Sequence, residues 1–562
     1  MIVTSSQFPH VISRLHQCKT LYVDCETTGL QMWRDDRLCG IAVEGDGQSY
    51  YFPFRHGEGE NLPLHSMTAF RNLLSSPKIT YVGFNYGFDM EFLYRDGVPY
   101  APKIEDVQTM AHLLNENEPK ATLKALGAKY IGSEAEEEEQ KLNDELKKRK
   151  LKKGQMSQLP AELVAPYAEQ DVILTRMLHE YYKPYLDKWK IHDLWQEYNE
   201  YQLAICEMER HGIGLDMALM DEYQEKAQTE VERCRKKIEE LAGYEINLNS
   251  APQLQKWLGL KSTAAKILEK MPKRPGVKEL LEYRGWNRVY ANYYRKFRET
   301  MDANCRLHAN LNLVGTETGR LSCSNPPLQA IPRSTDIYRV KDVFVASPGH
   351  TILEADYSQA EIRVATHYGN VVRMREKLLR GGDIHSETAE EIGIPRDAAK
   401  RLNFSVIYGI GPNTLADNLE IPRKQAREYL NKYHANYPGF KALYRSAEMK
   451  AKQRGFIRMF SGRMRHYNTK LAFPHKASSN LVQGTVGEML RVAITRIRRE
   501  TPYNMWLTVH DSVLFEIPEN ETKQAVKDIK RIMEDTPWCS IPMKIDFKAG
   551  RSWGQAKEIQ YD

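Results

Sequence analysis

The chain has 562 residues, of which 41% are hydrophobic and 27% are charged, and its 80 basic and 74 acidic side chains leave a net charge of +6. A chain of this length and composition folds into several domains, which excludes a disulfide-stapled miniprotein, a fibre and a wholly disordered chain. No run of 18 apolar residues and no signal-peptide pattern is present, so we expect no membrane partner, and the mild positive charge permits a nucleic-acid partner without requiring one.

The first 190 residues are predicted to form an α/β domain. Residues 19–24 and 79–84 have the composition of buried strands, and helical stretches alternate with strands up to about residue 190. A charged run at residues 133–155 has its acidic residues first and its basic residues second. We expect a solvent-facing helix or loop there, and contact of its basic residues with nucleic-acid phosphates is the alternative.

A helical arm is predicted over residues 192–300. Apolar residues recur there at three-to-four spacing, and Gly212 and Gly243 stand where two of the helices should end. Segments 260–271 and 277–297 continue the helical pattern, and the arm is rich in Lys, Arg and Tyr.

The remaining chain returns to β character over residues 305–370, with a strand that ends at Asp356. Residues 371–470 are again helical and basic. Two short apolar runs within residues 504–517 flank the pair His510–Asp511, which predicts a hairpin with a carboxylate at its tip.

Two carboxylates, Asp24 and Glu26, end the first predicted strand. Strand alternation places both on one face and turns Cys25 to the other. Adjacent acids repel one another unless a cation lies between them, and their hard oxygen ligands suit Mg²⁺ or Mn²⁺. Taken alone, such a pair is more often structural or solvated.

Two further motifs change that reading. Asp89 follows the second strand, and Tyr167 and Asp171 share one face of a predicted helix at i, i+4 spacing. The segments DCETTG, NYGFD and YAEQD, in this order, resemble the three motifs of the DEDD-type 3′–5′ exonucleases, in the subgroup with tyrosine.

That resemblance implies a two-metal site held by four carboxylates, namely Asp24, Glu26, Asp89 and Asp171. One ion would activate water and the other would stabilise the leaving oxygen. Tyr167 would orient the attacking water, and Asp106 would only support the site.

A second pattern lies between Asp356 and Asp511. Two cations and then two aromatic residues follow at four-residue spacing and form one helical stripe, which consists of Arg396, Lys400, Phe404 and Tyr408. The stripe suits a triphosphate clasped by the cations and a base stacked near the aromatic rings. The alternative is that the long basic side chains cover a core-facing stripe.

These segments resemble the family A DNA polymerases, meaning bacterial DNA polymerase I and its phage relatives. DYSQAEIR resembles motif A, R-x3-K-x3-F-x3-YG resembles motif B, and VHD resembles motif C. MERHGIGLD, LLEYRGW, TETGRLSCSNPPLQAIP, NLVQGT and GRSWGQA extend the resemblance from about residue 20 to residue 555.

The resemblance implies a multidomain α/β fold, in which an RNase H-like exonuclease domain precedes a right-hand polymerase with helical thumb, β-sheet palm and helical fingers. The expected domains are exonuclease 1–190, thumb 191–304, palm 305–370, fingers 371–474 and a second palm segment 475–562. The palm is split because its two aspartates bracket the fingers.

The resemblance also assigns roles to individual residues. Two Mg²⁺ (or Mn²⁺) ions per site would be bound in the palm by Asp356, Asp511 and the Tyr357 backbone carbonyl. The nucleotide would contact Arg396, Lys400, Phe404, Tyr408, Gln359 and Glu361, with Glu361 blocking a ribose 2′-hydroxyl. Primer-template DNA would contact Arg320, Gln329, Gln483 and His510.

Three positions depart from the family pattern. Ser512 stands where motif C usually has Glu, and His475 and Ser479 replace the usual Arg and Asn upstream of Gln483. The third carboxylate of motif C is therefore missing and we expect weaker DNA contacts at His475 and Ser479, while Asp356 and Asp511 remain for the chemistry.

The predicted function is template-directed DNA synthesis with 3′–5′ proofreading, on primer-template DNA and dNTPs. The alternatives are a DNA-binding 3′–5′ exonuclease and a catalytically silent DNA clamp with an inactive palm. We expect a monomer, with a helicase and a single-strand-binding protein as replisome partners, from a viral source.

The 8 scattered cysteines form no C-x-x-C pair, which argues against zinc and favours a reducing, cytoplasmic compartment.

Overall fold

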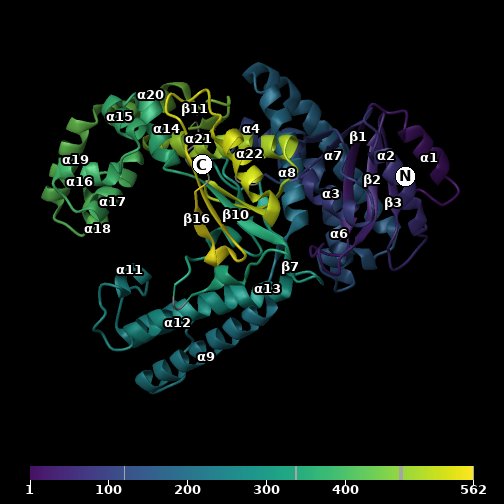
Figure 1. Cartoon of the computed structure of the whole chain (residues 1–562). Coiled ribbons are helices and arrows are strands. Elements are labelled where there is room, and N and C mark those ends of the chain that lie inside the picture. The colour runs from purple at the N-terminus through teal and green to yellow at the C-terminus, as the bar shows by residue number, and fades with distance from the viewer. Residues whose placement is uncertain (119–120, 336–337, 468–471, 561–562) are drawn as a thin grey trace.

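The computed structural model of the chain describes residues 1–118, 121–335, 338–467 and 472–560. Figure 1 shows a strand-rich unit at the N-terminal end, at the right, and a second sheet near the centre. Two sets of helices extend from the second sheet, one to the upper left and one downward. In the described part of the chain, no helix is long and apolar enough to cross a membrane.

The first sheet has five strands in the order β3-β2-β1-β4-β5. They are β1 (Thr20–Thr27), β2 (Leu38–Gly45), β3 (Gln48–Pro53), β4 (Thr80–Gly83) and β5 (Ile104–Asp106). β1 pairs with β2 antiparallel and with β4 parallel, so it lies in the middle of the sheet. The two strands predicted here are confirmed, and β1 continues three residues beyond the predicted end at Asp24.

Helices cover this sheet. They are α1 (Phe8–Leu15), α2 (Met67–Leu74), α3 (Tyr86–Arg95), α4 (Val107–Leu114), α5 (Leu123–Tyr130), α6 (Glu137–Lys148) and α7 (Ala161–Trp189). α7 packs across β1, β2, β3 and β4. The charged run forms α6, which buries only Leu142 and Leu146 and is otherwise solvent-facing, as predicted.

The second sheet has five antiparallel strands in the order β13-β14-β10-β15-β16. They are β10 (His350–Tyr357), β13 (Asn504–Val509), β14 (Ser512–Pro518), β15 (Ile545–Gly550) and β16 (Lys557–Ile559). The sheet therefore joins two distant segments, as expected of a split palm. His510 and Asp511 form the two-residue turn of the β13–β14 hairpin, with His510 at φ +58.

Two groups of helices extend from this sheet (Figure 1). The lower group contains α9 (Met217–Ala242), α10 (Ala251–Leu258), α11 (Ala265–Leu268), α12 (Val277–Val289), a π-helical turn (Tyr290–Tyr294) and α13 (Arg295–Thr300). The upper group contains α15 (Val372–Arg380), α16 (Ile384–Ile392), α17 (Arg396–Ile407), α18 (Pro412–Leu419) and α19 (Arg423–Asn436). These are the thumb-like and fingers-like parts of a right hand.

Four more helices lie close to the second sheet, namely α8 (His192–His211), α14 (Ala360–Gly369), α21 (Ala477–Glu500) and α22 (Thr522–Glu534). α20 (Pro438–Arg454) packs against α14 and α21 and leads to the hairpin β11 (Phe456–Arg458) and β12 (Met464–His466). Short pairs of strands are β6 (Ile213–Gly214) with β7 (Arg306–Leu307), and β8 (Asn310–Asn312) with β9 (Ser322–Ser324).

The helix ends at Gly212 and Gly243 are confirmed, since α8 ends at His211 and α9 at Ala242. The helix predicted over residues 260–271 is wrong for most of its length, because only the four residues of α11 are helical there. The exact domain boundaries stay predictions. α8, which falls in the predicted thumb, packs against β13, α21 and the first domain.

A buried ionic network ties the two halves together. Arg463 Nη1 donates to the Tyr198 hydroxyl over 2.7 Å, and its Nη2 lies 3.0 Å from His112 Nε2. Tyr198 in turn donates to Glu488, which pairs with Arg491 at 3.2 Å. Burial and the Arg463 charge lower the pKa of His112 to about 3, so its neutral ring can accept the hydrogen bond.

The neighbouring contact joins the first domain to the β11–β12 hairpin. Arg465 Nη1 and His466 Nδ1 lie 2.7 and 2.8 Å from the two oxygens of Glu116. The Glu116 and Arg465 side chains are 0% and 2% exposed, so their charges depend on one another.

We predict that Glu116→Gln lowers the free energy of unfolding by about 3–5 kcal/mol, because it deprives the buried Arg465 guanidinium of its buried anion. Chemical unfolding followed by circular dichroism measures the change. Although burial alone would raise it, the pKa of Glu116 is lowered to about 2 by His466 and Arg465. Its contribution is therefore present above the ordinary pKa of 4.5 and is lost as the pH falls through about 2.

Glu137→Gln is the matched control, because Glu137 is exposed on α6 and forms no ion pair within the described residues. Its change should stay within about 0.5 kcal/mol. Equal, small changes in both variants would contradict the role given to the Glu116 contact.

Candidate active sites

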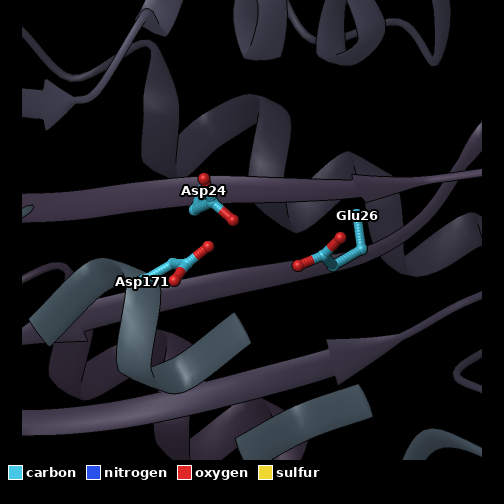
Figure 2. Close-up of side chains that lie close together, drawn as sticks. All are labelled: Asp24, Glu26 and Asp171. Carbon is cyan, nitrogen blue, oxygen red and sulfur yellow. The ribbon is translucent and has the colours of Figure 1, made fainter. Parts of the chain in front are cut away.

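Three carboxylates meet on the first sheet. Asp24 and Glu26 lie on β1 and Asp171 on α7, and Figure 2 shows their side chains pointing toward one another. One oxygen from each lies within 4.8 Å of the others. Glu26 and Asp171 are buried and Asp24 is half-buried, so their charges are poorly screened by water.

Asp89 lies beside this cluster rather than within it. It is on the first turn of α3, and its Oδ1 accepts the backbone N–H of Cys25 over 2.9 Å. Its charge still acts on Asp24. Asp106 lies apart, since it caps α4 by accepting the Thr109 N–H over 2.8 Å and also accepts the Tyr86 N–H over 2.6 Å.

The electrostatics of the cluster fit a divalent cation. Burial and the charge of Asp171 raise the pKa of Glu26 to about 8, and burial with the surrounding carboxylates raises the pKa of Asp24 well above its ordinary value. Several hard oxygen donors that repel one another are the donor set that Mg²⁺ and Mn²⁺ prefer. Asp24, Glu26 and Asp171 could therefore hold such an ion, with Asp89 close by.

The sequence analysis missed Lys124 on α5. Its ammonium forms an ion pair with Asp171 and lies 4.7 Å from the centroid of the Tyr167 ring. Tyr167 is itself hydrogen-bonded to Asp171, and Lys153 Nζ lies 5.3 Å from the centroid of the Tyr167 ring. Lys124 stands at no recognisable spacing from the site motifs in the sequence. The one feature that marks it is structural: it is a lysine among the buried residues of the short helix α5.

A second pair of aspartates meets on the second sheet. Asp356 on β10 is paired in register with Ser512, the first residue after the turn that carries Asp511. The Tyr357 N–H donates to the Asp511 carbonyl over 3.3 Å, which fixes the turn against β10. Burial and the charge of Asp511 raise the pKa of Asp356 to about 7.

Ser512 does not occupy an open position. It is 3% exposed, and its hydroxyl donates to the Val509 carbonyl over 3.0 Å inside the hairpin. Gln329 lies behind the same hairpin and donates to the Thr508 carbonyl over 3.0 Å. His510 is exposed at the turn.

Glu361 joins three separate segments. Its carboxylate accepts from Arg320 Nη2 over 2.7 Å and from the Tyr408 hydroxyl. Gln483 on α21 also hydrogen-bonds with Tyr408. Gln359, just before α14, adopts a left-handed conformation with φ +57. The structure thus brings Glu361, Arg320, Tyr408 and Gln483 together.

The predicted stripe lies on the exposed face of α17. Arg396, Lys400 and Tyr408 are exposed and Phe404 is half-buried. The helix instead buries Ala399, Leu402, Asn403, Val406 and Ile407. The cations therefore do not cover a core, and Arg396 Nε pairs with Asp383 over 2.7 Å.

His385 on α16 is buried next to Phe404 and was missed by the sequence analysis. Its ring centroid lies 5.8 Å from that of Phe404, and its Nδ1 is 3.0 Å from Asn403 Nδ2. Burial and the charges of Lys400 and Arg396 lower its pKa. No repeat or spacing in the sequence singles out this histidine.

Comparisons with known proteins agree with this geometry. The family model "DNA polymerase family A" matches residues 217–555, and the model "3'-5' exonuclease" matches residues 1–187. The thermostable DNA polymerase I of Thermus filiformis is 30% identical over 393 residues, 63% of this chain and 47% of that protein. DNA polymerase I of Pseudomonas aeruginosa is 25% identical over 607 residues, 99% of this chain and 66% of that protein.

The chain thus spans about half to two thirds of the length of these relatives. Its fold is similar to the POL domain of Pol1 from M. smegmatis, solved in complex with DNA primer-template and dNTP. The TM-score is 0.81 at 21% identity, and 99% of each chain is covered.

We predict that the metal-free protein loses stability as the pH rises. Because the folded-state pKa of Glu26, about 8, lies above its ordinary 4.5, its contribution is complete below pH 4.5 and is lost as the pH rises through 8. In EDTA, Glu26→Gln should flatten this dependence and raise the unfolding temperature at pH 8–9 by roughly 2–4 °C per kcal/mol gained.

Thermal unfolding from pH 5 to 9 tests this, with the exposed Glu137→Gln as the control. The control should follow the unmodified protein. A parallel pH dependence in all three proteins would show that the carboxylate cluster carries no stored repulsion.

Proposed function

Because the chain belongs to DNA polymerase family A, we propose that it is a template-directed DNA polymerase whose N-terminal domain is a 3′–5′ proofreading exonuclease. One observation carries this proposal: Asp356, near the end of β10, and Asp511, in the β13–β14 turn, are 155 positions apart in the sequence and come together at one end of the second sheet. The structural relative from M. smegmatis binds primer-template DNA and dNTP, and we propose the same ligands here.

In the palm, Asp356, Asp511 and the Tyr357 carbonyl would hold divalent ions, for which we propose Mg²⁺. When bound, the metal acts as a Lewis acid that favours the ionised primer 3′-hydroxyl and neutralises phosphate charge. The raised pKa of Asp356 supports this, because two carboxylates that resist joint ionisation gain most from a cation.

Arg396 and Lys400 would bind the triphosphate of the incoming nucleotide. Both are exposed, and Arg supplies a bidentate fork while Lys supplies a point charge. His385 lies next to Phe404, and its lowered pKa keeps the ring neutral, so that it could donate one hydrogen bond to a phosphate oxygen. Phe404 and Tyr408 would pack beside the sugar and base.

Glu361 would select deoxynucleotides. Arg320 and Tyr408 hold its carboxylate in place, so it can act as a rigid wall where a ribose 2′-hydroxyl would lie. Arg320 and Gln483 are neighbours of this group and would contact the primer-template, as would Gln329 and His510 around the Asp511 turn.

In the N-terminal domain, Asp24, Glu26, Asp89 and Asp171 would hold the ions for 3′–5′ hydrolysis. Burial and the charge of Asp171 raise the pKa of Tyr167, so its hydroxyl stays protonated and can orient a water molecule. A DNA clamp with an inactive palm is less well supported, because both palm aspartates are present and adjacent.

We predict that the two activities separate by mutation. On a 5′-labelled primer and longer template with Mg²⁺, the unmodified protein should extend the primer with dNTPs and shorten it without them. Asp511→Asn should reduce extension by at least about 10³-fold, since one metal ligand is lost, and keep shortening. Asp24→Asn with Glu26→Gln should do the reverse.

Asp417→Asn, an exposed carboxylate on α18, is the control and should change neither activity. Normal extension by Asp511→Asn would overturn the palm assignment. Shortening without extension by the unmodified protein would favour the exonuclease alternative, and neither activity would favour the silent clamp.

We further predict that Glu361→Ala raises the ratio of ribonucleotide to deoxynucleotide incorporation by at least about tenfold, roughly 1.4 kcal/mol of discrimination. Single-turnover incorporation of rATP and dATP measures that ratio, which is insensitive to a general loss of rate. Glu390→Ala, exposed on α16, should leave the ratio unchanged. An unchanged ratio in both variants would exclude the steric role.

A further inference from the structure

A groove of about 690 Å³ lies between the first domain and the base of the thumb helices. One wall comes from the loop 28–37, which joins β1 to β2, and from the end of α3. The other comes from the end of α13 and the turn that precedes β7. The basic residues that line it are Arg34, Arg37, Arg95 and Arg298, and we call it the arginine groove.

Three of these arginines gather around a single loop without an anionic partner. Arg95 donates through both Nη atoms to the Arg34 carbonyl over 3.3 Å, and Arg37 Nη1 donates to the same carbonyl over 2.9 Å. Arg34 Nη1 donates to the Glu299 carbonyl on the opposite wall. All these acceptors are backbone carbonyls, and none of the three arginines has an ion pair within 4 Å in the part of the chain that the structure describes.

The acidic residues in the lining do not balance this charge. Asp302 is engaged by backbone N–H groups, including that of Arg306 at 2.7 Å, and faces His308 at 3.5 Å. Asp35 is exposed. Burial is the main cause that lowers the pKa of Arg95, and the charge of Arg37 acts in the same direction against the nearby aspartates.

We propose that the arginine groove binds the phosphodiester backbone of DNA. Guanidinium forks match phosphate oxygens in pairs, and unpaired arginines lose no ion pair when a phosphate arrives. The loop 28–37 begins two residues after Glu26, and the opposite wall belongs to the polymerase half, so the groove is built from both halves of the chain. This inference rests on the proposed function, because that function identifies the bound polyanion as DNA. The DNA is either a single strand or a duplex.

The test is DNA binding by the full chain in EDTA, so that no hydrolysis occurs. Fluorescence anisotropy measures binding of a labelled single strand and of a blunt hairpin duplex between 50 and 200 mM NaCl. Arg34→Gln with Arg37→Gln and Arg95→Gln should weaken binding to one of them about tenfold or more. The slope of log affinity against log salt should fall by roughly 2, since each phosphate contact contributes about 0.7–0.9.

The matched control removes three exposed cations elsewhere, Lys523, Lys527 and Lys530 on α22, by substitution with Gln. It should change both affinity and slope far less. Arg34→Lys with Arg37→Lys and Arg95→Lys retains the charges, so it should restore the salt slope even where affinity stays reduced.

A loss confined to the single strand would assign the groove to unpaired DNA, and a loss confined to the hairpin would assign it to duplex. The proposal would be overturned if the glutamine variant and the α22 control had the same affinity and the same salt dependence on both DNAs. A lysine variant with the same slope as the glutamine variant would also overturn it, because the effect would then come from loop structure. The proposed function would instead be rejected if the unmodified chain neither extended nor shortened the primer. The binding measurements do not depend on that assay, so the two failures can be told apart.

Discussion

Carboxylates crowded together away from bulk water impose the constraint that shapes both halves of this molecule. Oxygens of Asp24, Glu26 and Asp171 lie within 4.8 Å of one another, and Asp356 shares its site with Asp511. Such groups repel, so each must be fixed by a rigid element, here a central strand, a long helix or a two-residue hairpin turn. The sheets hold the acids in place, and the cations they require come from the solvent or, as with Lys124, from the chain itself.

The sequence predicted the parts of each site that follow a local period. Asp24 and Glu26 alternate on a strand, and the exposed stripe on α17 follows from four-residue spacing on a helix. It could not predict Lys124 or His385, because each reaches its site from a separate helix through tertiary packing. The hydrogen bond from the Cys25 N–H to Asp89 could not be predicted either, because a backbone donor does not depend on the residue type.

The same limit appears in the fold. Apolar runs and glycines predicted the hairpin at 504–517 and the ends of α8 and α9. The segment 260–271 has helical composition yet forms only the short α11, because local propensity is a weak signal where tertiary contacts are few. Arg463 and Arg465 would be assigned to the surface from sequence alone, but both are buried.

Those two arginines have a consequence for how such proteins can be rebuilt. His112 and Glu116, which belong to the N-terminal domain, are among their partners, so the contacts of the β11–β12 hairpin are complete only when that domain is present. In a polymerase half produced alone, Arg465 would keep only the half-exposed Glu317 as an ion-pair partner and Arg463 would keep the Tyr198 hydroxyl, and a domain borrowed from a relative would have to supply acceptors that match His112 and Glu116. The two halves therefore cannot be exchanged freely between relatives. A chimera would need matching side chains across this contact as well as a suitable point of fusion in the chain.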